Sequence, residues 1–298
     1  MRCILNGPSK VTPWPLLRVK KGESRWQGLN LTYYGFFNAT AYTLASMIVV
    51  ILTYAAGMPL AMTINLIGLT LAVCMPGSRL IARFVEKKKH TFSVGGASFL
   101  GIILLPPLLL ILRPIVNSIW GLSLPVMVYL AAVSIAYGWG EGIGRLACIS
   151  FGCCYGKPLS AMPPGLRRCF RHWHFIFLGK TRKISYADRL DGVQVVPIQA
   201  ITAVLYCLTG LISLYLYLKG FFTLAFLLSL GVTQLWRFAS EFLRADYRGR
   251  GRISAYQYMS LGAVAYGLVV ALGLSTTTPP AVTIQIAYRR VVRRATTR

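Results

Sequence analysis

Seven apolar stretches, each long enough to cross the hydrocarbon core of a bilayer, dominate this chain of 298 residues. A transmembrane helix needs about 20 residues, and only helices and closed barrels satisfy their backbone hydrogen bonds in lipid. The stretches cover roughly 34–56, 60–79, 92–112, 117–144, 198–218, 221–244 and 255–274. Since 55% of the residues are hydrophobic and 13% are charged, the composition excludes a soluble domain of this length. We therefore predict an all-α polytopic membrane protein with about seven transmembrane helices.

The segments outside these stretches suggest how the chain is organised. A basic N-terminal segment (1–33) precedes a seven-helix membrane domain (34–274), and a basic tail (275–298) follows it. Between about 156 and 196 the sequence has aromatic, basic and turn-forming residues but no apolar run of membrane-spanning length. We expect this insertion to form a small extramembrane head. Prolines interrupt segment 1–33, which therefore does not resemble a cleavable signal peptide.

The net charge of +25 comes from 32 Lys and Arg against 7 acidic residues. These basic residues are divided among the segments between the apolar stretches, which favours contact with anionic lipid headgroups over nucleic acid binding. Most of them lie on the side of the N-terminus. The positive-inside rule, taken literally, therefore places the N-terminus in the cytoplasm.

Ionisable residues also occur within the apolar stretches themselves. Arg237, Glu241 and Arg244 have the spacing i, i+4 and i+7, so on a continuous helix they share one face. A charge at membrane depth costs about 2.5–3.5 kcal/mol, so such residues need a partner, a wet cavity or a ligand. Arg145 ends another apolar stretch and follows Glu141 at i+4. Arginines in excess over carboxylates predict a pocket for an anion that is also lipid-soluble, such as a phospholipid headgroup.

Three separated blocks carry a resemblance to a known family. The first runs from Gly144 to Gly156, GRLACISFGCCYG, and the second is Arg237 to Arg244, RFASEFLR, with Gln257 downstream. The third combines the Tyr-Gly at the start of the first apolar stretch with Pro197-Ile198-Gln199. In these blocks the chain resembles the bacterial prolipoprotein diacylglyceryl transferases, which are seven-helix enzymes of the cell (inner) membrane.

The resemblance implies an activity and a set of site residues. It implies transfer of a diacylglyceryl group from phosphatidylglycerol to the lipobox cysteine of a prolipoprotein, without a cofactor or a metal. Arg145 and Arg237 would hold the phosphate, and Tyr34 and Glu241 would orient it. The substrate-binding residues implied are Arg244, Gly156, Cys148, Gly95, Gly96 and Gln199. In the family's orientation the head and the arginine-bearing helix ends face away from the cytoplasm, opposite to the raw charge distribution.

This chain departs from the family pattern at several positions. Cys148 replaces an Asn, Val94 replaces the histidine of a His-Gly-Gly, and Val196 replaces a histidine before the Pro-x-Gln. The departures leave an alternative open, namely a non-catalytic family member that binds or scrambles anionic phospholipid. A small anion transporter is a third possibility, which only the arginines favour. For deprotonation of the acceptor thiol, Glu241, Tyr34 and His90 are candidates, although a positive pocket lowers a thiol pKa without a dedicated base.

The cysteines allow two further interpretations. A zinc site could use residues from Cys148, Cys153, Cys154, Cys169, His172 and His174. The adjacent cysteines and the His-x-His spacing differ from the paired C-x₂₋₄-C of structural zinc sites, so we expect no metal. A disulfide between the head and segment 148–154 is possible if that side of the membrane is oxidising.

Overall fold

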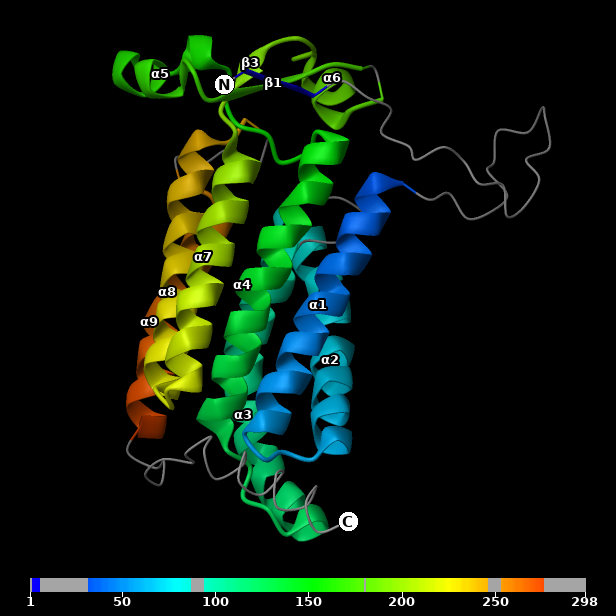
Figure 1. The fold of residues 1–298 in the computed structure, drawn as a ribbon, viewed down its shortest axis with the longest axis vertical. Helices are drawn as coiled ribbons and strands as arrows, with labels where there is room; N and C mark the ends of the chain where they lie inside the picture. Colours follow the sequence, from blue (N-terminus) through cyan, green and yellow to red (C-terminus); the bar gives the residue numbers. More distant parts are fainter. Residues whose placement is uncertain (1, 6–31, 87–93, 180, 246–252, 276–298) are drawn as a thin grey trace, which may run out of the picture. The chain divides into compact units, whose positions relative to one another are not determined.

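A computed structural model describes residues 2–5, 32–86, 94–179, 181–245 and 253–275. In these residues, seven helices are long and apolar enough to cross a membrane, which confirms the predicted all-α polytopic fold (Figure 1). They are α1 (Tyr33–Ala55), α2 (Leu60–Glu86), α3 (Val94–Trp120), α4 (Val126–Phe151), α7 (Ile198–Leu218), α8 (Phe222–Ser240) and α9 (Ala255–Ser275). The predicted C-terminal tail and most of the predicted N-terminal segment lie outside the described residues.

The third and fourth helices differ most from the predicted boundaries, and α2 continues to Glu86 instead of ending near 79. Helix α3 continues to Trp120 instead of ending near 112, because Pro106, Pro107 and Pro114 are accommodated within it. Gly121, with a φ of +62°, then ends the helix. Helix α4 consequently begins at 126 instead of 117, and it continues seven residues beyond the predicted end at 144. Arg145 thus lies inside the helix and not at its end.

The described residues belong to two compact units. Unit 1 comprises 1–43, 141–205 and 243–246, and unit 2 comprises 44–140, 206–242 and 247–298. Helices α1, α4 and α7 each contribute residues to both units.

Unit 2 is a helical bundle with one continuous apolar core. Helix α8 packs against α9, α2 against α3, and α3 against α9 (Figure 1). The segment 126–136 of α4 is almost wholly buried in this core, with Tyr129, Ala131 and Ile135 fully inaccessible. Large apolar side chains such as Ile51 and Ile111 point outward from the helices, as expected for surfaces in contact with lipid.

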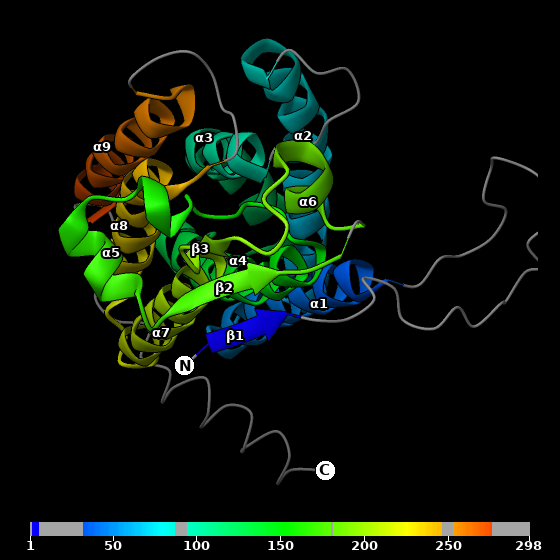
Figure 2. The same ribbon diagram turned by 90° about the horizontal axis from the view of Figure 1, so that it is seen from above.

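Unit 1 contains the short elements of the polar insertion. These are η1 (Leu159–Ala161), α5 (Pro164–Phe170), β2 (His174–Phe177), α6 (Lys183–Asp188) and β3 (Gln194–Val195). Strand β2 lies in the middle of a three-stranded sheet, antiparallel to β3 and parallel to β1 (Arg2–Leu5), with Cys3 opposite Phe175 (Figure 2). Phe175, Phe177 and Ile184 form the centre of its apolar core with Tyr155 and Val195.

Candidate functional site

An ion pair lies within α4, and its arginine belongs to the block from Gly144 to Gly156. The Arg145 Nη2 atom is 2.5 Å from the Glu141 Oε2 atom, and the two side chains are only 13% and 9% exposed. The i, i+4 spacing on a helix brings the two groups together. Removing one partner of a buried pair leaves an uncompensated charge, so each residue holds the other in position.

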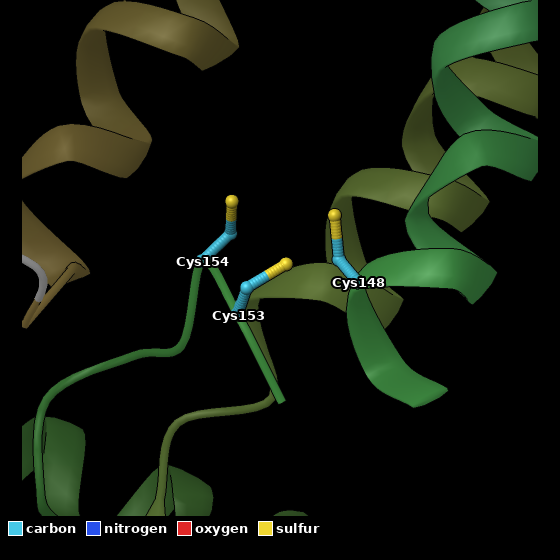
Figure 3. Close-up of side chains that lie close together, drawn as sticks. All are labelled: Cys148, Cys153 and Cys154. Carbon is cyan, nitrogen blue, oxygen red and sulfur yellow. The ribbon is translucent and has the colours of Figure 1, made fainter. Parts of the chain in front are cut away.

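A tight turn follows α4 and folds the chain back on the helix end. Gly152 and Cys154 have left-handed φ values of +67° and +55°, and the Cys153 amide donates to the Cys148 carbonyl over 3.1 Å. Glycine adopts this conformation at no steric cost, whereas cysteine is strained in it. The turn brings the Cys148, Cys153 and Cys154 sulfurs within 4.8 Å of one another, and the three side chains lie close together (Figure 3).

The three thiols have unequal proton affinities. Hydrogen bonds from Cys148 and Cys153 lower the pKa of Cys154 well below its usual range, and the charges of Arg244 and Arg145 lower it further, although burial opposes them. A hydrogen bond with Cys148 raises the pKa of Cys153, since one negative charge in the cluster disfavours another. Ionisation of one thiol in the cluster therefore disfavours ionisation of the others.

Tyr34 lies beside the same cluster. Its ring centroid is 5.4 Å from that of Phe151, and it interacts electrostatically with all three cysteines. Unit 1 thus brings together Tyr34, Arg145, Cys148 and Arg244 from the set implied by the family resemblance. Their roles in catalysis and substrate binding remain predictions.

The backbone around Gly156 connects Arg244 to the head. Gly156 pairs with Arg244 in an antiparallel bridge, and the Lys157 amide donates to the Leu243 carbonyl over 2.8 Å. On the other side, a Cβ atom at Gly156 would overlap the Val196 carbonyl. Glycine is therefore required here by packing between two backbone segments, while the predicted approach of lipid or peptide to Gly156 stays a prediction.

Arg244 is not on the helical face predicted for it. Helix α8 ends at Ser240, Glu241 begins the 3₁₀ helix η2 (Glu241–Leu243), and Arg244 follows in extended pairing with Gly156. The prediction of one continuous helical face for Arg237, Glu241 and Arg244 was therefore wrong. The pairing with Gly156 overrides the helical periodicity.

Two further side chains hold the cysteine segment in place. The Gln199 Nε2 atom donates to the Cys153 carbonyl over 2.9 Å, and Gln199 is 1% exposed. Arg182 was missed by the sequence analysis, although it is buried and donates from Nη1 to the Ser150 and Ile149 carbonyls at the end of α4. Nothing in the basic segment around Arg182 distinguishes it from its neighbours, so only the tertiary fold reveals this role.

Unit 2 contains the other implied residues. The Arg237 Nη1 atom donates to the Tyr137 hydroxyl over 3.2 Å, which joins α8 to α4. A Cβ atom at Gly95 would overlap the Arg237 Nη2 atom and approach the Tyr256 ring to 3.0 Å. Gly95 therefore leaves room for the guanidinium group at the start of α3, and Gly96 packs closely against Ile81.

The positions of other predicted residues are also informative. Six cysteines are free thiols, namely Cys74, Cys148, Cys153, Cys154, Cys169 and Cys207, and neither Cys169 nor a histidine joins the group of three in the described part of the chain. Val196 is fully buried, and His90 lies outside the described residues. Arg145 and Arg237 belong to different units, and their convergence on one phosphate stays a prediction.

The described residues define a polytopic membrane protein with seven apolar helices. Polar side chains lie within it, including half-buried arginines and a cluster of thiols at the end of one helix. The family model described as prolipoprotein diacylglyceryl transferase matches residues 24–272. The chain therefore belongs to the prolipoprotein diacylglyceryl transferase family, which is a family of transferases. A comparison with curated proteins gives no match.

Proposed function

We propose that this protein transfers a diacylglyceryl group from phosphatidylglycerol to the lipobox cysteine thiol of a prolipoprotein in the cell (inner) membrane. The family match carries the proposal, because it covers both blocks that contain the arginines. The gathering of Arg145, Arg244 and Tyr34 at one helix end supports it further.

The chemistry of the transfer fits these groups. The acceptor sulfur forms a bond to the glyceryl carbon of the lipid, the carbon–oxygen bond breaks, and glycerol phosphate leaves with the electron pair. Negative charge accumulates on the departing phosphate, where fixed guanidinium groups stabilise the transition state. In this proposal Arg145 and Arg237 hold the phosphate, Tyr34 and Glu241 orient it, and Arg244 and Gln199 bind the remaining parts of the substrates.

The test is transfer of label from phosphatidylglycerol to a lipobox peptide by the full chain in lipid vesicles. We expect Arg145→Ala to abolish transfer, and Arg145→Lys to reduce it strongly while keeping a partner for Glu141. Arg167→Ala, on an exposed part of α5, is the matched control. Full transfer by both Arg145 variants would refute the phosphate-holding role.

The same assay separates the enzyme from the non-catalytic alternative. A wild-type protein that binds phosphatidylglycerol but never labels the peptide would reject the transferase proposal. If Val94→His then created activity in the silent protein, the residue replacing the family histidine would account for the silence. In that case, binding or scrambling of anionic phospholipid would become the better description.

A further inference from the structure

The cysteine cluster has the composition and size of a soft-metal site. Three sulfurs lie within 4.8 Å of one another at the end of α4 (Figure 3). Tetrahedral zinc binds thiolates at about 2.3 Å, which places two bound sulfurs about 3.8 Å apart. Small side-chain rotations therefore suffice to bring the three sulfurs onto one ion. The sequence spacing argued against zinc, but the left-handed turn at Gly152 and Cys154 brings together residues that the spacing separates.

Hydrogen bonds from neighbouring segments hold the backbone around the cluster in place. The Cys153 carbonyl accepts a hydrogen bond from buried Gln199, and the Gly152 carbonyl accepts one from the Ile184 amide over 3.0 Å. Cys154 is held in a conformation that is strained for a residue with a side chain. Such strain persists only where the surroundings enforce it, and it is concentrated at functional sites.

We propose that Cys148, Cys153 and Cys154 bind one Zn²⁺ ion, whose fourth position takes the acceptor thiol. The second half of this inference rests on the proposed transferase function, whereas the first half does not. Zinc sites with three protein ligands and an open fourth position are the catalytic kind. A thiol that binds such an ion loses its proton, so the metal supplies the activation that Val94 and Val196 cannot provide as hydrocarbon side chains.

The charges around the cluster partly compensate one another in this arrangement. Zinc with three thiolates carries one negative charge, and binding of the acceptor thiolate adds a second. Arg145, which is also paired with Glu141, and Arg244 both act electrostatically on the cluster, and they offset part of the excess negative charge. Because the complex is electron-rich, the bound acceptor sulfur stays nucleophilic.

The transfer step then balances without any redox change. The acceptor S–H bond breaks as its sulfur binds zinc, and the proton passes to solvent. The sulfur forms a bond to the glyceryl carbon, and the carbon–oxygen bond breaks with its electron pair on the departing phosphate. That phosphate takes up a proton from solvent, and zinc remains divalent throughout.

The first experiment measures metal binding alone. The full chain, purified in detergent under reducing conditions, is loaded with Zn²⁺ or with Co²⁺ and dialysed, and its metal content is measured. We expect one ion per chain and thiolate-to-cobalt absorption in the wild type, and loss of both in the Cys148→Ser and Cys153→Ser variants. Cys169→Ser and Cys74→Ser are the matched controls, since these cysteines lie outside the cluster. Metal content equal in wild type and cluster variants, or a disulfide within the cluster of the isolated protein, would overturn the metal site.

The second experiment tests the open position and separates this inference from the proposed function. Addition of a lipobox peptide to the cobalt-loaded protein should increase the thiolate-to-cobalt absorption, and a peptide with serine in place of the cysteine should not. Removal of the metal by a chelator should reduce transfer by about 10²-fold or more, with recovery on adding Zn²⁺. Full transfer by the metal-free protein would overturn the thiol-activating role. Metal binding without any transfer would instead refute the proposed function and leave the zinc site standing.

Discussion

Arg182 gives the sharpest test of how the head holds the end of α4. The last carbonyls of a helix have no partner within the helix, and Arg182 supplies one for Ser150 at 2.9 Å and for Ile149 at 3.3 Å. Its Nε atom also donates to the Leu178 carbonyl over 3.0 Å, and its guanidinium lies 5.7 Å from the Phe177 ring centroid. One side chain therefore joins α4 to two parts of the head.

The expected effect follows from these contacts. A hydrogen bond from a charged donor contributes about 1.5–3 kcal/mol, and two of the three have short donor–acceptor distances. Burial lowers the pKa of Arg182, which shows that holding the charge here has a desolvation cost that offsets part of this gain. We expect Arg182→Met, which keeps the apolar stem, to lower the free energy of unfolding by about 2–4 kcal/mol. Arg182→Lys should lose about half as much, because it keeps the charge but not the planar fork.

The assay is unfolding of the full chain in mixed micelles, with cysteine labelling followed by mass spectrometry as a local measurement. Buried Cys153 should be labelled faster in Arg182→Met, since the turn after α4 loosens. Arg168→Met, on an exposed part of α5, is the matched control. If the Arg182 and Arg168 variants agree within about 0.5 kcal/mol and in Cys153 labelling, the capping argument is wrong.

Three other substitutions test separate parts of the site. Gly156→Ala should lower the free energy of unfolding by about 1–3 kcal/mol, because the added Cβ atom overlaps a backbone carbonyl. Gly165→Ala is the control, since the space around Gly165 is open. Equal stability of the two variants in thermal unfolding would contradict this packing. Gly95→Ala should displace the Arg237 guanidinium and lower the transfer rate at unchanged expression. Gly101→Ala, on the same helix, is the control. An unaltered transfer rate in Gly95→Ala would argue against the placement of Arg237 beside Gly95. Arg237→Lys should lower the transfer rate by about 10²-fold, and a rate within a factor of two or so of wild type would show that bare charge suffices.

The membrane-spanning helices could be predicted because hydropathy is a local property of the sequence. The predicted helix boundaries were wrong where a proline or a glycine can lie either inside a membrane helix or at its end. The end predicted near 112 was wrong because α3 continues through Pro114, and prolines within membrane helices are tolerated. Gly152 was a usable signal for the end of α4, since helices commonly end before a glycine in the left-handed conformation.

The sequence could name candidate site residues but could not predict how they are arranged. The family-like blocks identified Arg145 and Cys148, and the i, i+4 spacing correctly predicted the ion pair with Glu141. The spacing could not predict that Arg244 leaves the helix, because its bridge partner Gly156 is distant in the chain. It also could not identify Arg182, since the carbonyls that it caps lie more than thirty residues earlier.

The end of α4 is an unfavourable place for thiolates, and this explains why arginines gather there. The C-terminus of a helix carries the equivalent of about half a negative charge, which opposes any further negative charge nearby. Cys153 and Cys154 directly follow this end, so their ionisation requires compensating cations. Arg182 occupies the carbonyls themselves, while Arg145 and Arg244 act on Cys154. The positive groups proposed to hold a departing phosphate therefore also allow a thiolate cluster to exist beside it, so Cys148 in place of the family's Asn is compatible with the rest of the site.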